Sequence, residues 1–412
     1  MSSDPTRLAA FDLLSAVLDR RRSLDDALDA LPAMEARDKA AGHRLAAAVL
    51  RRAGTLDAVL EPKLRKAPPD PVRHILRMGA AALLLLDTPA HAAVATAVGL
   101  ARARGLAPFT GLVNAVLRKV AGEGKAALEG LDGPRLDTPP WLWTSWGRAA
   151  RAIAEAHQHE ASLDLTIAAH ADPPPGGTAL PTGSWRYPPG TRVADLPGFA
   201  EGNFWVQDAA AALPARLLAV QPGERVADLC AAPGGKAAQL AETGAQVTAV
   251  ERDTGRIARL RDNLGRLRLS ADIVAADVTA WRPPVALDAV LLDAPCSATG
   301  TIRRHPEVLH LRRPRDIAAM AEQQDRLLEA ACAMLRPGGR LVYAVCSLQA
   351  EEGPERIAAA LTRLPVRGEP FQADETLLPE ALLPQGWLRT TPALWPERGG
   401  MDGFFVARLV RL

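Results

Sequence analysis

The sequence predicts an α/β domain in the C-terminal part of the chain, preceded by an all-α domain. From about residue 206, short apolar runs alternate with helical segments, a pattern typical of a parallel sheet with helices on both faces. Before residue 138, apolar residues recur at helical spacing, and no stretch alternates as a half-buried strand would. A chain of 412 residues is long enough for two or three domains.

Composition and charge exclude several classes of protein. Apolar residues make up 48% of the chain and charged residues 23%, as in soluble globular proteins. The net charge of +2 neither requires nor excludes a nucleic-acid partner, because binding to a polyanion depends on a local basic patch. The first residues lack the basic and apolar parts of a signal peptide, and polar residues interrupt the most apolar stretch, near 79–101. We therefore expect a cytoplasmic protein that makes no membrane contact.

The cysteines suggest neither a metal site nor a disulfide framework. There are four, at positions 230, 296, 332 and 346. No two of them have CxxC spacing, and no set of Cys and His residues resembles a zinc site. Few, unpaired cysteines suit a reducing compartment.

Residues 1–137 are expected to form a bundle of helices. Asp4-Pro5 is typical of a helix start, with an acid at the N-cap and proline in the first turn. Basic residues cluster in sequence near the last helices, which is the pattern of either a solvated face or a patch that binds phosphate groups. These residues are Arg102, Arg104, Arg118, Lys119 and Lys125.

Residues 138–205 have a different character. Trp141 starts a short helical run that we expect to reach about Leu165. Prolines and glycines then concentrate in 173–177 and 188–190, which are signals of turns and linkers. We expect a small, proline-rich connecting subdomain here, followed by the α/β domain over 206–412.

Five strands are expected in the α/β domain, each a short apolar run that ends at a turn. They cover Arg225–Ala231, Gln246–Glu251, Ile273–Asp277, Leu287–Asp293 and Leu341–Ser347, and a long helix is expected over about 315–336. In open α/β sheets, ligands bind outside the carboxyl ends of the strands. The residues that end these strands are therefore the candidates for a site.

The first strand runs into the glycine turn Asp228-Leu-Cys-Ala-Ala-Pro-Gly-Gly-Lys236, which opens a helix. Glycine lets the backbone approach a ligand closely, but the turn matches neither a P-loop nor GxGxxG. Glu251 ends the second strand, where an acid can accept both ribose hydroxyls of an adenosine, and Asp277 ends the third. Each acid alone is also typical of a turn or a cap. Together with the glycine turn they outline an adenosyl pocket without a second phosphate grip, which fits S-adenosylmethionine better than a dinucleotide.

Two further cysteines end the fourth and fifth strands, in Asp293-Ala-Pro-Cys296 and Val345-Cys346. If these strands are neighbours, both thiols face one site. A thiolate can add to C6 of a pyrimidine, which makes C5 nucleophilic toward a methyl donor, and a base must then remove the C5 proton. Asp293 is placed to hydrogen-bond or protonate the ring at N3. A single cysteine at a strand end is more often a small buried apolar residue, but two at adjacent strand ends favour this chemistry.

For other polar residues near these motifs, two interpretations remain open. Lys236 is either a solvated side chain or a group that contacts the ligand or the target base. The loop Arg303–Pro306 either grips substrate phosphates or simply carries exposed charge. Cys332 lies in an apolar helix and is expected in the core, and Cys230 is expected to pack at the pocket wall.

These motifs resemble those of the bacterial small-subunit ribosomal RNA cytosine-5 methyltransferases of the RsmB (Sun/Fmu) type. The segments that carry the resemblance are Asp228–Lys236, Leu291–Gly300, Ile302–Glu307, Val345–Ser347, Phe204–Asp208 and Asp402–Phe405. The helical part, with Val113–Lys119, is similar to the NusB-like RNA-binding domain of that family. The resemblance covers nearly the whole chain.

The resemblance implies a Rossmann-like, S-adenosylmethionine-dependent methyltransferase domain that modifies C5 of a cytosine in 16S ribosomal RNA. Cys346 would be the nucleophile, and Cys296 would assist proton removal and product release. Asp293 and Lys236 would also touch the cytosine. The residues that would line the cofactor pocket are Asp228, Cys230, Ala231, Ala232, Pro233, Gly234, Gly235, Lys236, Glu251, Asp277 and Asp293. Glu251 stands where the family pattern has Asp, which keeps the carboxylate.

The expected partner is ribosomal RNA that is unassembled or partly assembled, because the target base must be unstacked to meet a thiol at a strand end. We expect no DNA partner and a monomer. Three other functions remain open: a tRNA cytosine-5 methyltransferase, a DNA cytosine methyltransferase and a non-catalytic NusB-like RNA-binding factor.

Overall fold

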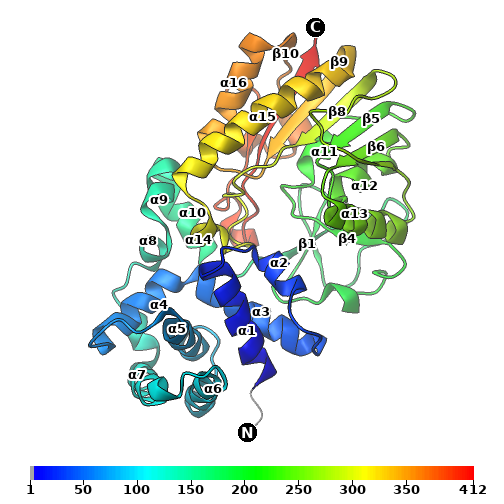
Figure 1. Cartoon of the computed structure of the whole chain (residues 1–412). Coiled ribbons are helices and arrows are strands. Elements are labelled where there is room, and N and C mark those ends of the chain that lie inside the picture. The colour runs from blue at the N-terminus through cyan, green and yellow to red at the C-terminus, as the bar shows by residue number, and fades with distance from the viewer. Residues whose placement is uncertain (1–3) are drawn as a thin grey trace. The chain divides into compact units, whose positions relative to one another are not determined.

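The structure is a computed structural model that describes residues 4–412. It divides into two compact units (Figure 1). The helical unit comprises Met1–His159 together with Ile302–Arg312, and the second unit comprises Glu160–Thr301 and Arg313–Leu412. Within the described residues, no helix combines the length and the apolar character needed to cross a membrane.

The helical unit confirms the prediction of an all-α domain. Its helices are α1 (Pro5–Leu18), α2 (Leu24–Asp29), α3 (Ala36–Arg51), α4 (Ala53–Leu60), α5 (Asp70–Leu84), α6 (Ala90–Ala103), α7 (Thr110–Glu123), α8 (Gly133–Asp137), α9 (Pro140–Trp146), α10 (Ala150–His157) and α14 (Val308–Leu311). Asp4 caps α1 as predicted, because its carboxylate accepts a hydrogen bond from the Thr6 N–H at 3.0 Å. The helices enclose one apolar core, in which Leu14, Ile75 and Leu117 are fully buried.

A segment distant in sequence completes this helical unit. Ile302 is fully buried, and Leu311 packs against the helical core. Arg51 Nη2 donates to the Arg303 carbonyl at 2.9 Å, and His310 Nε2 lies 2.8 Å from the Leu50 carbonyl. The segment Ile302–Arg312 therefore belongs to the helical unit rather than to the sheet that precedes it.

The second unit begins with a small antiparallel sheet. Its strands are β1 (Leu163–Ile167), β2 (Thr178–Ala179), β3 (Trp185–Tyr187) and β4 (Phe204–Val206), in the order β2-β3-β1-β4. The expected helical run to Leu165 was wrong in its second half, because α10 ends at His157 and β1 follows. Buried Asp164 pairs with Arg186 at 2.6 Å, and Arg186 also donates to the carbonyl of Gly400, which ties this sheet to the C-terminal segment.

The large sheet has eight strands. They are β5 (Arg225–Leu229), β6 (Gln246–Glu251), β7 (Asp272–Ala275), β8 (Leu287–Asp293), β9 (Leu335–Val345), β10 (Val366–Gly368), β11 (Leu388–Arg389) and β12 (Phe405–Arg411). The order is β10-β12-β9-β8-β5-β6-β7, with β11 also paired to β12. The strands β9, β8, β5, β6 and β7 run parallel as predicted, and the helix expected over 315–336 is α15 (Pro314–Met334).

Sequence analysis did not predict the antiparallel strands at one edge of the sheet. The strand β12 pairs antiparallel with β9, and β10 and β11 pair antiparallel with β12. No alternation marks β12, because both of its faces are buried and Arg408 interrupts its apolar run. Arg408 is itself buried and ion-paired with Glu369 at 2.8 Å.

Helices cover both faces of the large sheet (Figure 1). Besides α15, they are α11 (Leu213–Leu217), α12 (Gly235–Glu242), α13 (Thr254–Leu267), α16 (Pro354–Arg363) and α17 (Ala373–Thr376). Successive side chains of β9 point to opposite faces. Tyr343 and Val345 pack in the core that includes residues of α15 and α16, whereas Val342 and Ala344 pack in the core that includes residues of α11 and α12.

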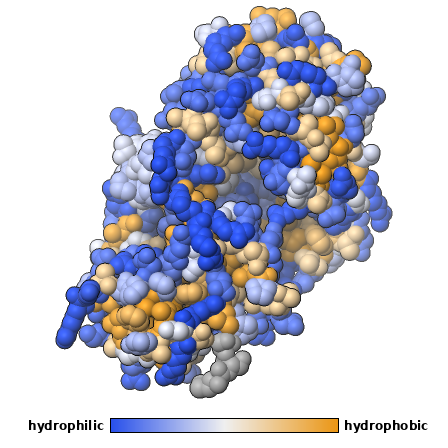
Figure 2. All heavy atoms as spheres, in the orientation of Figure 1, coloured by the Kyte–Doolittle hydropathy of each residue, from blue (hydrophilic) through white to orange (hydrophobic). Residues whose placement is uncertain are grey.

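Large apolar side chains are concentrated in these cores rather than on the surface. On the face that Figure 2 shows, hydrophilic and hydrophobic atoms are interspersed over the molecule. Among the residues from 4 onward, the exposed large hydrophobic side chains are Leu136, Val206, Val285 and Leu412. Burial of apolar surface is therefore the main stabilising contribution in each unit.

In the helical unit, we expect the loss of Asp137 to lower stability strongly. The buried carboxylate of Asp137 accepts from the Thr55 N–H and hydroxyl, both at 2.7 Å, and pairs with Arg52 at 2.9 Å, so it satisfies the start of α4. Asp137→Ala leaves these buried donors unpaired and should lower the free energy of opening α4 by about 3 kcal/mol. Hydrogen exchange of the α4 amides measures this. Glu155→Ala, which removes an exposed ion pair, should change it by less than about 0.5 kcal/mol. Equal effects of the two variants would contradict the assignment.

Candidate active site

The turn after β5 has the form that the sequence predicted. Asp228 is fully buried near the end of the strand, and Gly234 adopts φ +106° directly before α12 begins at Gly235. A Cβ atom on Gly234 would lie 2.7 Å from Leu260 Cδ1 of α13. Glycine is therefore needed at this position for the left-handed conformation and for the close approach of two helices. Cys230 lies in the same turn, with φ +63°.

The acid that ends β6 is suited to a ribose. Glu251 is buried, and its Oε1 accepts from the N–H groups of Arg252 at 2.9 Å and Asp253 at 3.1 Å. Its Oε2 accepts no hydrogen bond from the described residues and lies 3.2 Å from Arg256 Nη1. A buried acceptor oxygen without a hydrogen bond at a strand end is what the adenosine of S-adenosylmethionine would satisfy. The residues present therefore fit this cofactor.

Asp277, two residues beyond β7, occupies a more exposed position. Its Oδ1 accepts from the hydroxyl of Thr279 at 2.6 Å and from the Thr279 N–H at 2.8 Å. These hydrogen bonds lower the pKa of Asp277, so it is a carboxylate at neutral pH. Oδ1 thus serves the local turn, as the cap interpretation expected.

A partly buried ion pair joins the glycine turn to the end of β8. Lys236 Nζ lies 2.8 Å from Asp293 Oδ2 and 5.4 Å from the centre of the Phe404 ring. Burial alone would lower the pKa of Lys236, but the charge and hydrogen bond of Asp293 outweigh it, so the pKa is raised. Lys236 is therefore a firmly held ammonium group and not a solvated side chain.

The two thiols predicted to share a site are adjacent. Because β8 and β9 are neighbours, Cys296 Sγ and Cys346 Sγ lie 3.4 Å apart. Their contact is the largest cause that raises the pKa of Cys296 well above its ordinary value, and burial adds to it. A negative charge on Cys346 contributes to the raised pKa of Lys236. Cys346 therefore lies close to the Lys236 ammonium group, with the thiol of Cys296 beside it.

Of the other two cysteines, Cys332 lies in the core as predicted, and Cys230 lies in the glycine turn. Burial, followed by the charges of Glu251 and Asp293, raises the pKa of Cys230 to about 12. Cys230 is thus an unreactive thiol in the turn. Cys332 is buried in α15 and belongs to the core on that face of the sheet. Within residues 4–412 no group of His, Cys, Asp and Glu is arranged to hold a metal ion.

Comparison with known proteins gives the family. Residues 215–410 match the model of the 16S rRNA methyltransferase RsmB/F family, and residues 4–122 match the NusB family. A ribosomal RNA small subunit methyltransferase B of Pseudomonas putida is 37% identical over 98% of both chains. Its namesake in Xanthomonas campestris is 40% identical over 87% of this chain and 88% of its own. The chain belongs to the ribosomal RNA small subunit methyltransferase B family.

This membership confirms the expected fold and the expected cofactor. The crystal structure of PH0851, at 22% identity and a TM-score of 0.76 over the full length of both chains, shows the same fold. As a member of the RsmB family, the protein is an S-adenosylmethionine-dependent 16S rRNA methyltransferase with an N-terminal NusB domain.

Sequence analysis missed one residue of this site, Glu352. Glu352, in the turn after Cys346, is fully buried and hydrogen-bonded to both cysteine-bearing loops. Gly403 contacts the loop of Cys296, because its N–H donates to the Gly300 carbonyl at 2.8 Å, and a Cβ atom on Gly300 would lie 2.0 Å from the Gly403 carbonyl oxygen. The Asp402-Gly-Phe-Phe motif pointed to this second contact, whereas no sequence signal marked Glu352.

The loop after the first cysteine differs from one expectation. Arg303 is 2% exposed and lies in the helical unit, so its guanidinium group is not available to grip phosphates in this structure. Arg304, the next residue, is exposed.

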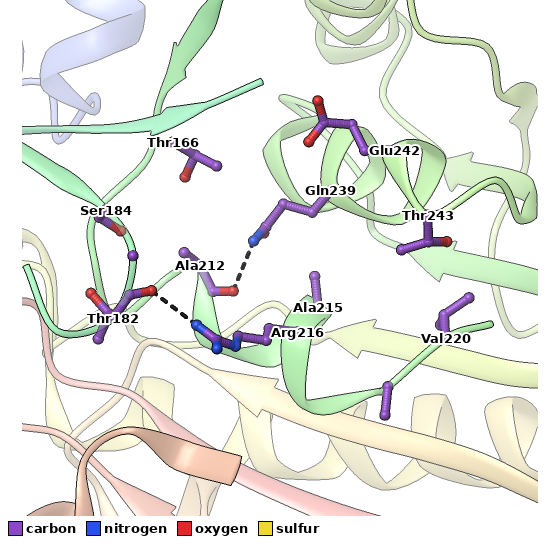
Figure 3. A pocket seen from close by; sticks show the side chains of 12 residues that line it. Thr166, Thr182, Ser184, Ala212, Ala215, Arg216, Val220, Gln239, Glu242 and Thr243 are labelled. Atoms are coloured by element: carbon purple, nitrogen blue, oxygen red, sulfur yellow. Dashed lines mark hydrogen bonds between the residues drawn. The ribbon is translucent and has the colours of Figure 1, made fainter. Parts of the chain in front are cut away.

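A separate pocket of about 410 Å³ lies where the small sheet meets α11 and α12 (Figure 3). It is lined by Thr166, Thr182, Gly183, Ser184, Ala212, Ala215, Arg216, Ala219, Val220, Gln239, Glu242 and Thr243. Arg216 donates to the Thr182 carbonyl at 3.2 Å, and Gln239 donates to the Ala212 carbonyl at 3.0 Å. None of the residues predicted for the site lines this pocket, so it marks the junction of the two sheets.

The buried carboxyl group of Asp228 predicts a pH dependence. Burial, helped by the charges of Asp293 and Glu251, raises its pKa to about 8. The folded state therefore holds this proton more tightly than the unfolded state does, and the stabilisation is complete below about pH 4 and is lost as the pH rises through about 8. Relative to Asp228→Asn, the unfolding free energy of the wild-type protein should fall by about 1.4 kcal/mol per pH unit between pH 5 and 7. Urea unfolding of the cofactor-free proteins, followed by hydrogen exchange in β5, gives this difference, and parallel curves would rule out the raised pKa.

Proposed function

We propose that this 16S rRNA methyltransferase acts on C5 of a cytosine, through a temporary covalent bond between Cys346 Sγ and C6 of the base. The observation that carries the proposal is the 3.4 Å separation of two thiols beside the Lys236–Asp293 ion pair. A site that only bound a base would have no use for two thiols in contact. Nucleophilic addition followed by proton removal needs a nucleophile and a base, and two adjacent thiols can supply both.

The cofactor pocket that we propose is the one expected from the motifs. It comprises Asp228, Cys230, Ala231, Ala232, Pro233, Gly234, Gly235, Lys236, Glu251, Asp277 and Asp293. Glu251 supports this assignment best, because its Oε2 is a buried acceptor without a hydrogen bond. S-adenosylmethionine, when bound, supplies the methyl group that is transferred to C5.

In the first step, the Cys346 thiolate forms a bond to C6, and the electron pair of the C5–C6 double bond moves toward C5 and the ring. The Lys236 ammonium group, which Asp293 holds at 2.8 Å, lies close to the reacting atoms. Asp293 lies beside the edge of the base, and the Lys236 ammonium group that it holds balances the negative charge that develops on the ring. These residues make C5 nucleophilic toward the methyl group.

In the second step, Cys296 removes the proton that C5 still carries. The main cause that raises the pKa of Cys296 is its contact with Cys346. Once Cys346 Sγ is bonded to carbon it no longer carries a negative charge, so Cys296 releases its own proton to solvent more readily and can act as the base. Removal of the C5 proton re-forms the C5–C6 double bond, breaks the S–C6 bond and returns Cys346 as a thiolate.

We further propose that the substrate is naked or partly assembled ribosomal RNA, in which the target cytosine can leave its stack. The protein would act in the cytoplasm as a monomer without a DNA partner. We also propose that the chain comprises a NusB-like part over 1–137, a connecting part over 138–205 and a catalytic part over 206–412. A tRNA substrate remains the rival for the same chemistry and is an outcome of the test below.

The test is tritium transfer from methyl-labelled S-adenosylmethionine to unmodified 16S rRNA and to tRNA. Cys346→Ala should lower transfer at least about a thousandfold, because the nucleophile is lost. Cys296→Ala should accumulate a covalent protein–RNA adduct that resists denaturing electrophoresis, because addition proceeds while proton removal does not. Cys332→Ala, which removes a buried thiol elsewhere, should stay within about twofold of wild type.

Other outcomes reject part or all of this proposal. Full turnover by Cys346→Ala would exclude the covalent mechanism. Label found only in tRNA would keep the chemistry and replace the substrate. Cofactor binding without any transfer would favour a non-catalytic RNA-binding factor.

The helical unit offers a candidate surface for RNA phosphates. Of the five clustered basic residues, Arg104 is paired with Asp12 and Lys125 with Asp87, both at 2.7 Å. The other three, Arg102, Arg118 and Lys119, are exposed on α6 and α7. We propose that these three contact phosphates, because exposed cations can neutralise phosphates and so release the counterions condensed on the RNA.

Replacing Arg102, Arg118 and Lys119 with Ala should make RNA binding less sensitive to salt. Each lost contact to a single strand should reduce the slope of log K against log salt by about 0.7, so the triple variant should lose about 2. Filter binding across a salt series measures the slope. Lys125→Ala is the matched control, since its charge is already paired. Equal slopes for the wild-type protein and the triple variant would exclude the patch.

A further inference from the structure

The side chain of Glu352 occupies an unusual position between the two cysteine-bearing loops. It is fully buried in the short 3₁₀ turn Ala350–Glu352 that follows β9. Its Oε1 accepts from the Ser297 N–H at 2.8 Å and from Gln324 Nε2 at 3.1 Å. Its Oε2 accepts from the Ser347 hydroxyl at 2.5 Å and from the Ser297 hydroxyl. One carboxylate thus binds the residue directly after each reactive cysteine.

The partners of this carboxylate are neutral. Within residues 4–412, no Lys, Arg or His side chain forms an ion pair with Glu352, so four N–H and O–H donors alone compensate its burial. An acid buried in this way is costly unless every acceptor site is satisfied. Four donors from three separate segments meet at this one carboxylate, so its hydrogen bonds fix these segments relative to one another.

The surrounding contacts make the cluster rigid. Gln324 also donates to the Pro295 carbonyl at 2.9 Å, directly before Cys296. The Tyr343 hydroxyl donates to the Glu352 carbonyl at 2.6 Å, which fixes the turn that carries the carboxylate. The Gly300 N–H donates to the Cys346 carbonyl at 3.0 Å. The peptides on both sides of Cys296 are therefore anchored, through Gln324 and Glu352, to the loop of Cys346.

We infer that Glu352 is a positioning residue that sets the separation of the Cys296 and Cys346 thiols. The inference rests on the proposed cytosine-5 mechanism, in which one thiol holds the base while the other removes its proton. Addition at C6 needs Cys346 alone. Proton removal also needs the Cys296 thiol at the correct distance from the base that Cys346 holds. A displacement of about 1 Å at a reacting group costs roughly a hundredfold in rate. Loss of Glu352 should therefore slow proton removal and product release more than it slows addition.

The test compares Glu352→Gln with Glu351→Gln in the full-length protein. The Gln amide has nearly the shape of the carboxylate. Its NH₂ group, however, is itself a donor, so it cannot accept the hydrogen bonds made at one of the two oxygen positions. The neighbouring Glu351 is exposed, which makes it the matched control. With 16S rRNA and labelled S-adenosylmethionine, Glu352→Gln should lower turnover roughly tenfold to a hundredfold while the steady-state covalent adduct rises several-fold. Glu351→Gln should match the wild-type protein in both measurements.

The adduct separates a positioning role from a merely structural one. If Glu352→Gln lowers turnover and adduct formation by the same factor, or leaves turnover within twofold of wild type, the inference is overturned. Should this variant not fold, Ser347→Ala decides in its place. It removes one donor to Oε2 and should give the same rise in adduct with a smaller loss of turnover, and an unchanged adduct level would overturn the inference.

The wild-type protein and Cys346→Ala report separately on the proposed function. A wild-type adduct that disappears in Cys346→Ala supports the cytosine-5 mechanism, whatever Glu352→Gln does. Full methyl transfer by Cys346→Ala would overturn the mechanism and the inference with it.

Discussion

The parallel pairing of β8 with β9 is the constraint on which the candidate site depends. Asp293 lies opposite Ala344 in this register, and the pairing continues beyond the strands, because the Ala294 N–H donates to the Ala344 carbonyl at 2.9 Å. Since side chains alternate along a strand, a slip of one residue would turn one partner toward the opposite face. The thiols of Cys296 and Cys346 therefore meet only in this register. The antiparallel strand β12, on the other side of β9, brings Gly403 to the same loops.

Buried acids mark the positions where geometry matters most in this chain, and each is stabilised in a different way. A carboxylate removed from water must be ion-paired, hydrogen-bonded or protonated. Asp164 is paired with Arg186, and Glu352 is held by neutral donors. Asp228 lies among other acids and is mostly protonated at neutral pH. Asp293 is paired with Lys236 at 2.8 Å.

The predictable parts of the fold and site were those encoded over a few consecutive residues. The bounds of β6 and β8, the glycine turn and the paired thiols all follow from apolar runs that end at acids, glycines or cysteines. Burial of Glu352 could not be predicted, since it depends on Gln324 and Ser297, which are 28 and 55 positions away, and its exposed neighbour Glu351 is chemically identical. The strands of the small sheet are two to five residues long and lie between proline and glycine turns, so their periodicity is too short to detect.

The discontinuity of the helical unit has a consequence for biosynthesis. The ribosome releases Met1–His159 first, and all of Glu160–Thr301 must emerge before Ile302–Arg312 can join the helices. Until then Ile302 has no core to enter, and Arg51 lacks the carbonyl of Arg303. Domains usually mature in the order in which they are translated. Here the helical unit, which is synthesised first, is completed only after Glu160–Thr301 of the second unit has been made. A nascent chain that stops short of residue 312 therefore contains neither unit in complete form.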